Sequence, residues 1–261
     1  MKMSSNKQLI AVRENDWWNR FKNILFVELG DFWKSKDWIW MSLLWIGIGN
    51  GISALTYLGG DVEMVAIFNI FFIFIGLFPP IATILVMQDS IVGEQRSGAI
   101  LWLLSKPISR QSFIFAKWLG NSINLLVCIT IIPGTIGYFE FSAFSGEWLS
   151  PILYFTGISI LMLYHLFFIG FTLLLGTIMD TPGGVAAPPM ILNFAQQFFQ
   201  SIPFASHVLP LTLFLNQPSN SVILSIILGE IPSTIIPIVS TGIFAVLFLF
   251  LAIWKFNKVD L

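Results

Sequence analysis

Six apolar stretches, most of them about 20 residues or longer, constrain this chain more than any other feature of its sequence. A helix needs about 20 apolar residues to cross the hydrocarbon core of a bilayer. Of the 261 residues, 56% are hydrophobic and only 10% are charged, which excludes an ordinary soluble domain. We therefore predict an all-α polytopic membrane protein with six transmembrane helices. The predicted spans are residues 38–58, 64–87, 113–138, 151–179, 186–203 and 235–254.

The distribution of lysine and arginine predicts which side of the membrane each segment faces. Residues 1–37 contain seven of the thirteen Lys and Arg residues, residues 88–118 contain four, and residues 255–261 contain the other two. The predicted segments on the opposite side contain none. Segments rich in Lys and Arg stay in the cytoplasm. We therefore predict a multi-pass protein of the cytoplasmic (inner) cell membrane, with both termini in the cytoplasm.

Two segments outside the predicted spans have a pattern that suits the membrane surface. From residue 15 to 35, Trp-rich apolar side chains recur every three or four residues between polar ones, which favours an interfacial amphipathic helix over a soluble packing helix. The segment 204–234 is apolar but interrupted by Pro210, Pro218 and Pro232. A full extra span there would place the basic C-terminus outside. We therefore predict two short re-entrant helices in the outer leaflet.

The longest charged interruption between spans is the segment 88–121. Its pattern predicts a short surface helix over residues 89–104, a break at Pro107, and a second helix from Ser109 that enters the third span. Such a segment can lie at the membrane surface and present its polar end to a cytosolic protein. The alternative is a solvated loop between two spans.

This segment also carries a recognisable sequence pattern. Residues 94–100 read EQRSGAI, and residues 103–110 read LLSKPISR. The pattern resembles the cytoplasmic signature of ABC exporter permeases of the type-2 (ABC-2) class: Glu, three residues, Gly-Thr-Leu, then Leu-Leu-Ser-x-Pro-Ile-Ser-Arg. Ala99 and Ile100 stand here in place of Thr and Leu. The C-terminal residues 256–261, FNKVDL, also resemble that family's usual ending, so with the span spacing the resemblance covers nearly the whole chain.

The sequence contains none of the motifs that would make the chain itself an enzyme. None of its nine lysines follows a glycine, so it has no Walker A loop to hold a nucleotide. Neither His165 nor His207 belongs to an HExxH motif, and no Gly-x-Ser-x-Gly elbow occurs. We predict no catalytic residue, no metal site and no cofactor in this chain, and we expect His165 to be a hydrogen-bonded interior residue. If ATP drives the protein, ATP and Mg²⁺ bind a separate ATPase subunit.

The resemblance implies that the segment 88–110 is the coupling helix between spans two and three, which contacts that ATPase. We expect polar contacts from its charged residues, close approach at its glycine and a helix end at its proline. For the two charged residues near position 95, the alternative is a solvated helix end. The candidate coupling residues are Glu94, Arg96, Gly98, Pro107 and Arg110.

The fifth predicted span carries four amide side chains at unusual depth. They are Asn193, Gln196, Gln197 and Gln200. Steps of three, four and seven place them within roughly 100° of one helical face. Amides that face lipid would leave donors and acceptors unpaired, so this face must meet another helix or water. Two alternatives remain: the face lines a translocation path, or it forms interhelical hydrogen bonds, including those of a dimer interface.

The resemblance implies one transmembrane domain over residues 1–261 that acts as the permease subunit of an ATP-driven ABC exporter. Such a subunit forms the path as a dimer with a second copy or a related permease, and it is coupled to ABC ATPase subunits. The other expected partner is membrane lipid, and no nucleic acid is expected. One alternative is a non-transporting scaffold or assembly subunit. The other is an ion-coupled secondary transporter, which we rank last because the predicted spans offer only His165 as a mid-membrane ionisable group.

Overall fold

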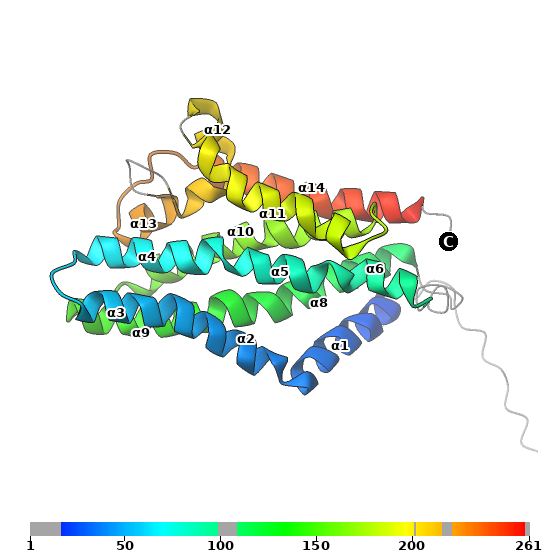
Figure 1. The fold of residues 1–261 in the computed structure, drawn as a ribbon, viewed down its shortest axis with the longest axis horizontal. Helices are drawn as coiled ribbons and strands as arrows, with labels where there is room; N and C mark the ends of the chain where they lie inside the picture. Colours follow the sequence, from blue (N-terminus) through cyan, green and yellow to red (C-terminus); the bar gives the residue numbers. More distant parts are fainter. Residues whose placement is uncertain (1–16, 99–108, 201, 216–220, 259–261) are drawn as a thin grey trace, which may run out of the picture.

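The computed structural model describes residues 17–98, 109–200, 202–215 and 221–258, and every regular element in these ranges is a helix (Figure 1). The predicted all-α fold is therefore confirmed. Five helical stretches in the described ranges are long and apolar enough to cross a membrane. They are Asp37–Leu58, Met64–Arg96, Arg110–Ser145, Pro151–Gly176 and Ile236–Asn257.

The N-terminal helix lies at an angle to the rest of the bundle (Figure 1). Helix α1 (Trp17–Ser35) matches the predicted amphipathic helix, and the first candidate span follows as α2 (Asp37–Trp45), the π-helix η1 (Ile46–Asn50) and α3 (Gly51–Leu58). Between α1 and α2, Lys36 adopts a left-handed conformation with φ of 63°. Such a residue cannot continue a right-handed helix, so the chain turns sharply at this point.

The second candidate span consists of three helices in series: α4 (Met64–Leu77), α5 (Pro79–Met87) and α6 (Asp89–Arg96). The break between α4 and α5 lies at Pro79 and Pro80, the first two residues of α5. Neither proline has a backbone N–H, so the helical hydrogen-bond ladder is interrupted there. Helix α6 continues the same span into the segment 88–110, which was predicted to contact an ATPase.

The third candidate span contains a second π-helical segment. It consists of α8 (Arg110–Leu126), η2 (Val127–Ile131) and α9 (Ile132–Ser145). From the sequence, this span was predicted to end at residue 138. That boundary is wrong: the helix continues to Ser145, so Glu140 lies inside it.

The central helix of the bundle is α10 (Pro151–Gly176), which contacts α5, α8, α11, α13 and α14. The final candidate span is α14 (Ile236–Asn257). Helix α11 (Pro182–Phe199) corresponds to the predicted fifth span, but it is not among the five candidate spans. Its two internal prolines and its amide side chains lower its hydropathy.

Between α11 and α14 the described chain forms three short helices: α12 (Pro203–Val208), the 3-10 helix η3 (Pro210–Leu213) and α13 (Val222–Ile227). Helix α12 projects from the bundle, whereas η3 and α13 are buried against it (Figure 1). Burial of this irregular backbone in protein is what a membrane environment requires. Re-entry of this segment into the membrane stays a prediction.

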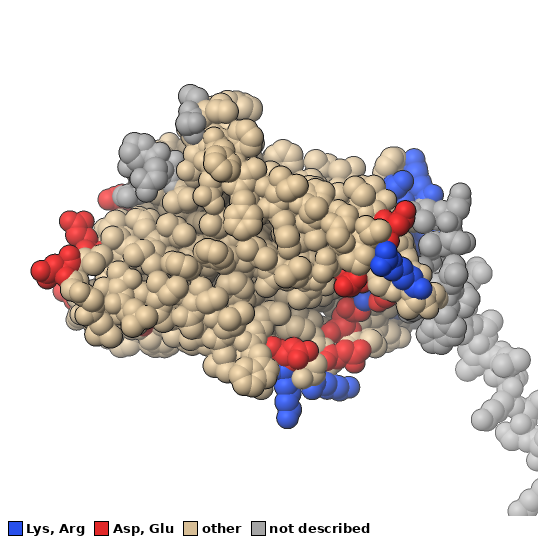
Figure 2. Space-filling model, viewed as in Figure 1, with Lys and Arg blue, Asp and Glu red and all other residues tan. Residues whose placement is uncertain are grey.

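Charged side chains lie at the two ends of the bundle (Figure 2). We call one the basic end; it contains the last turns of α6 and α14 and the first turn of α8. The described Lys and Arg residues gather there and along α1. We call the other the acidic end; its described turns contain Asp61, Glu63, Glu147 and Glu230 and no Lys or Arg.

Gly76 lies where α4 packs against Phe214, a fully buried ring that also contacts the Tyr164 ring. A Cβ atom at Gly76 would lie 2.8 Å from three atoms of the Phe214 ring. We expect Gly76→Val to lower the free energy of unfolding by about 1–3 kcal/mol, because overpacking forces neighbouring side chains out of their rotamers. The measurement is the midpoint of thermal unfolding in detergent.

The control for this variant is Gly47→Val, because no atom lies within 4 Å of a Cβ at Gly47. Equal midpoints for the two variants would show that the Gly76–Phe214 contact does not constrain the core.

Candidate functional site

At the basic end, α8 is the common partner of α1 and α6. Helix α1 packs closely along α8, and the approach is tightest at Gly120. A Cβ atom there would lie 2.9 Å from Cβ of Glu28. Small residues allow helices to approach this closely in membranes. Two side-chain amides of α8 also contact the neighbouring helices: Asn124 Nδ2 donates to the carbonyl of Glu28 at 3.3 Å, and Asn121 Nδ2 donates to Ser90 Oγ at 3.5 Å.

An ion-pair cluster forms the centre of this junction. The ammonium of Lys117, on α8, pairs with the carboxylates of both Glu28, on α1, and Glu94, on α6. We call these three residues the Lys117 cluster. Lys117 is only 7% exposed, and a buried ammonium is tolerated only when it is paired. The cluster therefore joins α1, α6 and α8 electrostatically.

A water-accessible cleft adjoins the Lys117 cluster between α1 and α8. Its volume is about 450 Å³. Besides the three cluster residues, Asp31 and Asp37 contribute carboxylates to its lining. The acidic side chains beside α1 are visible at this end in Figure 2. The junction therefore opens to solvent on one side, although its central ammonium is buried.

Two further predicted coupling residues, both arginines, form hydrogen bonds within the chain. Arg96 Nε donates to the carbonyl of Asp180, in the turn after α10, at 3.2 Å. Arg110 Nη1 donates to the carbonyls of Phe256 and Asn257, at 3.4 and 3.2 Å. The last carbonyls of a helix lack intrahelical donors, so a basic side chain placed there satisfies them. These bonds tie α6 to the end of α10, and α8 to the end of α14.

Of the helix predicted over residues 89–104, the part up to Arg96 is helical as α6, and residues 99–104 lie outside the described residues. Gly98 has φ of 72°, a left-handed conformation that terminates helices and favours glycine. No atom of the described residues beyond its chain neighbours lies within 4 Å of a Cβ at this position. Within the chain, Gly98 therefore serves to turn the backbone, and its predicted close approach to an ATPase stays a prediction. Pro107 lies outside the described residues.

On α11, the predicted amide residue Asn193 connects three helices. Tyr164 of α10 donates its hydroxyl hydrogen to Asn193 Oδ1 at 2.8 Å, and Asn193 Nδ2 donates to the carbonyl of Leu77, at the end of α4, at 2.9 Å. The Leu77 carbonyl is free to accept because Ile81 N–H bonds to Phe78 instead. Asn193 is fully buried. It therefore replaces a backbone hydrogen bond that the proline break removes.

Two more amides of α11 hold the segment that contains η3. Gln196 Oε1 accepts a hydrogen bond from Leu211 N–H at 3.0 Å, and Gln200 Nε2 donates to the carbonyl of Leu215 at 2.9 Å. Gln197 is exposed on the surface of the chain. Three of the four amides therefore form hydrogen bonds within the chain, and one faces outward. Whether any of them lines a path or a dimer interface stays a prediction.

His165, on α10, lies beside the same proline break. Its Nδ1 lies 2.8 Å from Thr130 Oγ1, in η2. Its Nε2 is buried and has no hydrogen-bond partner among the described residues. The N–H groups that would bond the carbonyls of Ile75 and Gly76 in an intact helix are absent, because residues 79 and 80 are both prolines. The prediction of a hydrogen-bonded interior histidine is confirmed.

The Lys117 cluster was not predicted from the sequence. One signal was available: Lys117 interrupts an apolar helix, and a basic residue in such a place needs an acidic partner. Which carboxylates would serve could not be read from the sequence, because Glu28 and Glu94 belong to other helices. Tyr164 was missed for the same reason, since its partner Asn193 lies on α11.

A comparison with protein-family models agrees with this architecture. The model described as "ABC-2 family transporter protein" matches residues 2–261. No curated protein matches the chain significantly. The family match covers nearly the whole sequence, including the EQRSGAI and LLSKPISR motifs. This chain therefore belongs to the ABC-2 transporter family.

Proposed function

We propose that this chain is the membrane-spanning permease subunit of an ATP-driven exporter, and that it works as a dimer with separate ATPase subunits. Family membership supports a permease. The observation that carries the proposal further is the junction at the basic end. There α6, which contains the first three residues of the family motif, is bonded to α8 and to the turn after α10, and Lys117 of α8 connects it to α1. A displacement of α6 would therefore be transmitted to several helices at once.

We also propose six membrane crossings with both termini in the cytoplasm. The hydrogen bonds of Arg96 and Arg110 place the C-terminal ends of α10 and α14 at the basic end. The chain between them must therefore return to the acidic end once, and α11 is the helix that leads back. Its 18 residues span about 27 Å, close to the hydrocarbon thickness of about 30 Å. The concentration of Lys and Arg at the basic end favours a cytoplasmic location for that end.

In this proposal the ATPase contacts the exposed end of α6. Arg96 and Ser97 are exposed there, whereas Glu94 faces Lys117 inside the chain. We therefore assign Arg96 to the ATPase contact and Glu94 to transmission of movement from α6 to α1. Closure of the ATPase pair would favour one arrangement of these helices over the other, which is the only way that binding energy can drive a conformational change.

The second permease copy would pack on α11. Gln197 and Phe198 are exposed on this helix. An amide that faces lipid would leave its donors and acceptors unpaired. A second copy, or water in a path between the two copies, would supply the missing partners for Gln197.

The test is purification of the tagged protein from its native membrane in mild detergent, with co-purifying proteins identified by mass spectrometry. We expect an ATPase with a Walker A motif to co-purify with the wild type. The amount of co-purified ATPase should fall about 10-fold with Arg96→Glu, because a reversed charge at a contact opposes binding. The matched control is Lys34→Glu, the same charge reversal on an exposed side chain of α1. Absence of any ATPase with the wild type would contradict the proposal and favour the scaffold alternative.

A further inference from the structure

One carboxyl group lies inside a candidate membrane span, away from both the basic-end junction and the amides of α11. Glu140 belongs to α9, five residues before that helix ends at the acidic end. Ionisable side chains in membrane helices are costly, and they usually have a specific partner or a function.

The partner of Glu140 is Asn50, the last residue of the π-helix η1 in the first candidate span. Asn50 Nδ2 donates to Glu140 Oε2 at 2.8 Å and to the carbonyl of Pro133 at 3.2 Å. Asn50 is only 5% exposed. Both N–H hydrogens of the Asn50 amide therefore donate hydrogen bonds. Short π-helical segments such as η1 often present side chains at functional sites.

Two oxygen atoms of this pair have no hydrogen-bond partner among the described residues. They are Glu140 Oε1 and Asn50 Oδ1, and both are buried. An ionised carboxylate can only accept hydrogen bonds, and the oxygen of an amide is likewise an acceptor only. With Glu140 ionised, the pair therefore has two unsatisfied acceptors and no donor for either of them. Buried polar atoms without a partner are uncommon and need an explanation.

A single proton resolves this imbalance. Bound to Glu140 Oε1, it would make that oxygen a donor for Asn50 Oδ1, while Asn50 Nδ2 continues to donate to Glu140 Oε2. The two side chains would then form an acid–amide pair with two hydrogen bonds and no net charge. We propose that Glu140 and Asn50 form an intramembrane proton-binding site, which holds η1 against α9 when it is occupied.

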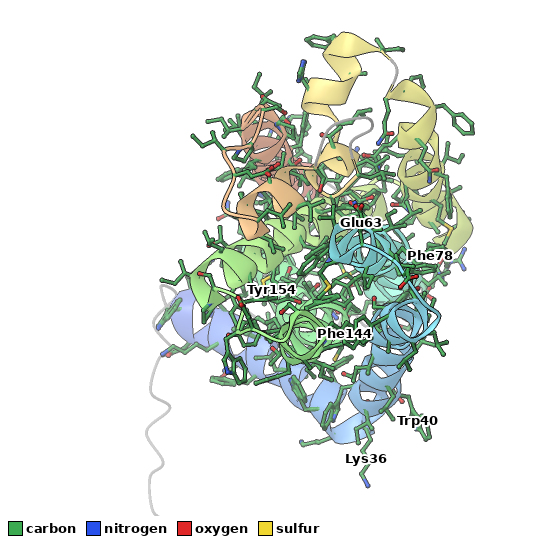
Figure 3. All side chains as sticks on the ribbon, turned by 90° about the vertical axis from the view of Figure 1, so that its left-hand side faces the viewer. Lys36, Trp40, Glu63, Phe78, Phe144 and Tyr154 are labelled. Carbon is green, nitrogen blue, oxygen red and sulfur yellow. The ribbon has the colours of Figure 1, made fainter. Side chains whose placement is uncertain are left out.

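The surroundings of the pair offer Glu140 no competing cation. The titratable group that approaches it from α10 is Tyr154, whose hydroxyl donates to the carbonyl of Gly134 at 3.0 Å. On α9 itself, Tyr138 donates to the carbonyl of Leu149, and on α3 the ring of Tyr57 stacks on Phe144. Figure 3, viewed from the acidic end, shows Tyr154 and Phe144 among the helices and Trp40 on the outside.

No lysine or arginine occurs in the described part of the acidic end. An ionised Glu140 would therefore lack a counter-charge from the described residues, whereas a protonated Glu140 needs none. This difference favours occupation of the site by a proton. Loss of the proton would leave an unpaired charge between η1 and α9 and would draw water into their contact.

The experiment is infrared spectroscopy of the purified full-length protein in lipid at neutral pH. We expect the C=O stretching band of a protonated carboxylic acid in the wild type, and we expect Glu140→Gln to lack it. The matched control is Glu147→Gln, a carboxylate in the acidic-end loop, which should leave the band unchanged. Absence of any band difference between wild type and Glu140→Gln would overturn the proposal.

A second variant tests the role of Asn50. In Asn50→Leu the acid proton loses its acceptor, so the band should move to higher frequency but remain present. An unshifted band would show that Asn50 is not the acceptor and would overturn the paired site. Glu140→Gln retains an amide–amide pair with Asn50, so its thermal midpoint should stay within a few degrees of wild type. The readout needs neither an ATPase nor a transported substrate, so failure here is separable from failure of the proposed exporter function.

Discussion

Replacement of Lys117 by methionine is expected to lower the free energy of unfolding by about 3 kcal/mol. Methionine fills a similar volume but leaves Glu28 and Glu94 close together without a counter-charge. Removal of one partner from a buried ion pair typically costs about 3–5 kcal/mol. The two carboxylates are 20% and 29% exposed and can be partly rehydrated, so we expect the lower end of that range. The thermal midpoint should fall by ~6–12 °C.

Two controls separate the ion pairs from a general effect of losing a lysine. Lys34→Met removes an exposed lysine of α1 and should change the midpoint little. The triple variant Glu28→Gln, Glu94→Gln, Lys117→Met removes all three charges and should regain most of the loss, because a neutral buried site needs no counter-charge. If Lys117→Met and Lys34→Met have the same thermal midpoint, the Lys117 cluster contributes nothing to stability.

Replacement of Asn193 by leucine is expected to lower the free energy of unfolding by about 2 kcal/mol and the thermal midpoint by ~4–8 °C. The variant removes two buried interhelical hydrogen bonds, one from Tyr164 and one to the carbonyl of Leu77. Hydrogen bonds between membrane helices average about 0.6 kcal/mol and reach about 1.7 kcal/mol. We use the upper part of this range because the Leu77 carbonyl also lacks its usual helical donor.

Gln197→Leu is the matched control for Asn193→Leu, since it replaces an exposed amide on the same helix. In the isolated protomer, Gln197→Leu should leave the thermal midpoint unchanged or raise it slightly. Tyr164→Phe removes only one of the two hydrogen bonds and should therefore lose about half as much as Asn193→Leu. Equal midpoints for Asn193→Leu and Gln197→Leu would refute the role of Asn193 as a link between helices.

Much of the fold could be predicted from the sequence because the bilayer thickness sets helix length. The first predicted span, residues 38–58, nearly coincides with Asp37–Leu58, and the break at Pro79 and Pro80 follows from proline chemistry. The end of the third span was misplaced for one physical reason. A lone glutamate in an apolar run indicates a loop unless a distant partner such as Asn50 satisfies it.

Less of the candidate site could be predicted, because its contacts join residues far apart in the chain. The motif identified Glu94 and Arg96 as important, but it gave no indication that Glu94 pairs with Lys117 and Glu28. Helical spacing placed four amides on one side of α11, yet it could not show which neighbours they meet. Gln196 and Gln200 bond to the chain around η3, a segment whose path depends on tertiary packing.

The interruption at Pro79 and Pro80 has a mechanical consequence. Bending an intact helix strains its hydrogen-bond ladder, but here several bonds of the ladder are already absent. Asn193 of α11, itself bonded to Tyr164 of α10, instead holds the Leu77 carbonyl at the end of α4. We therefore expect α5 and α6 to tilt more easily about this break than an intact helix would allow, with a stiffness that depends on side chains of α10 and α11.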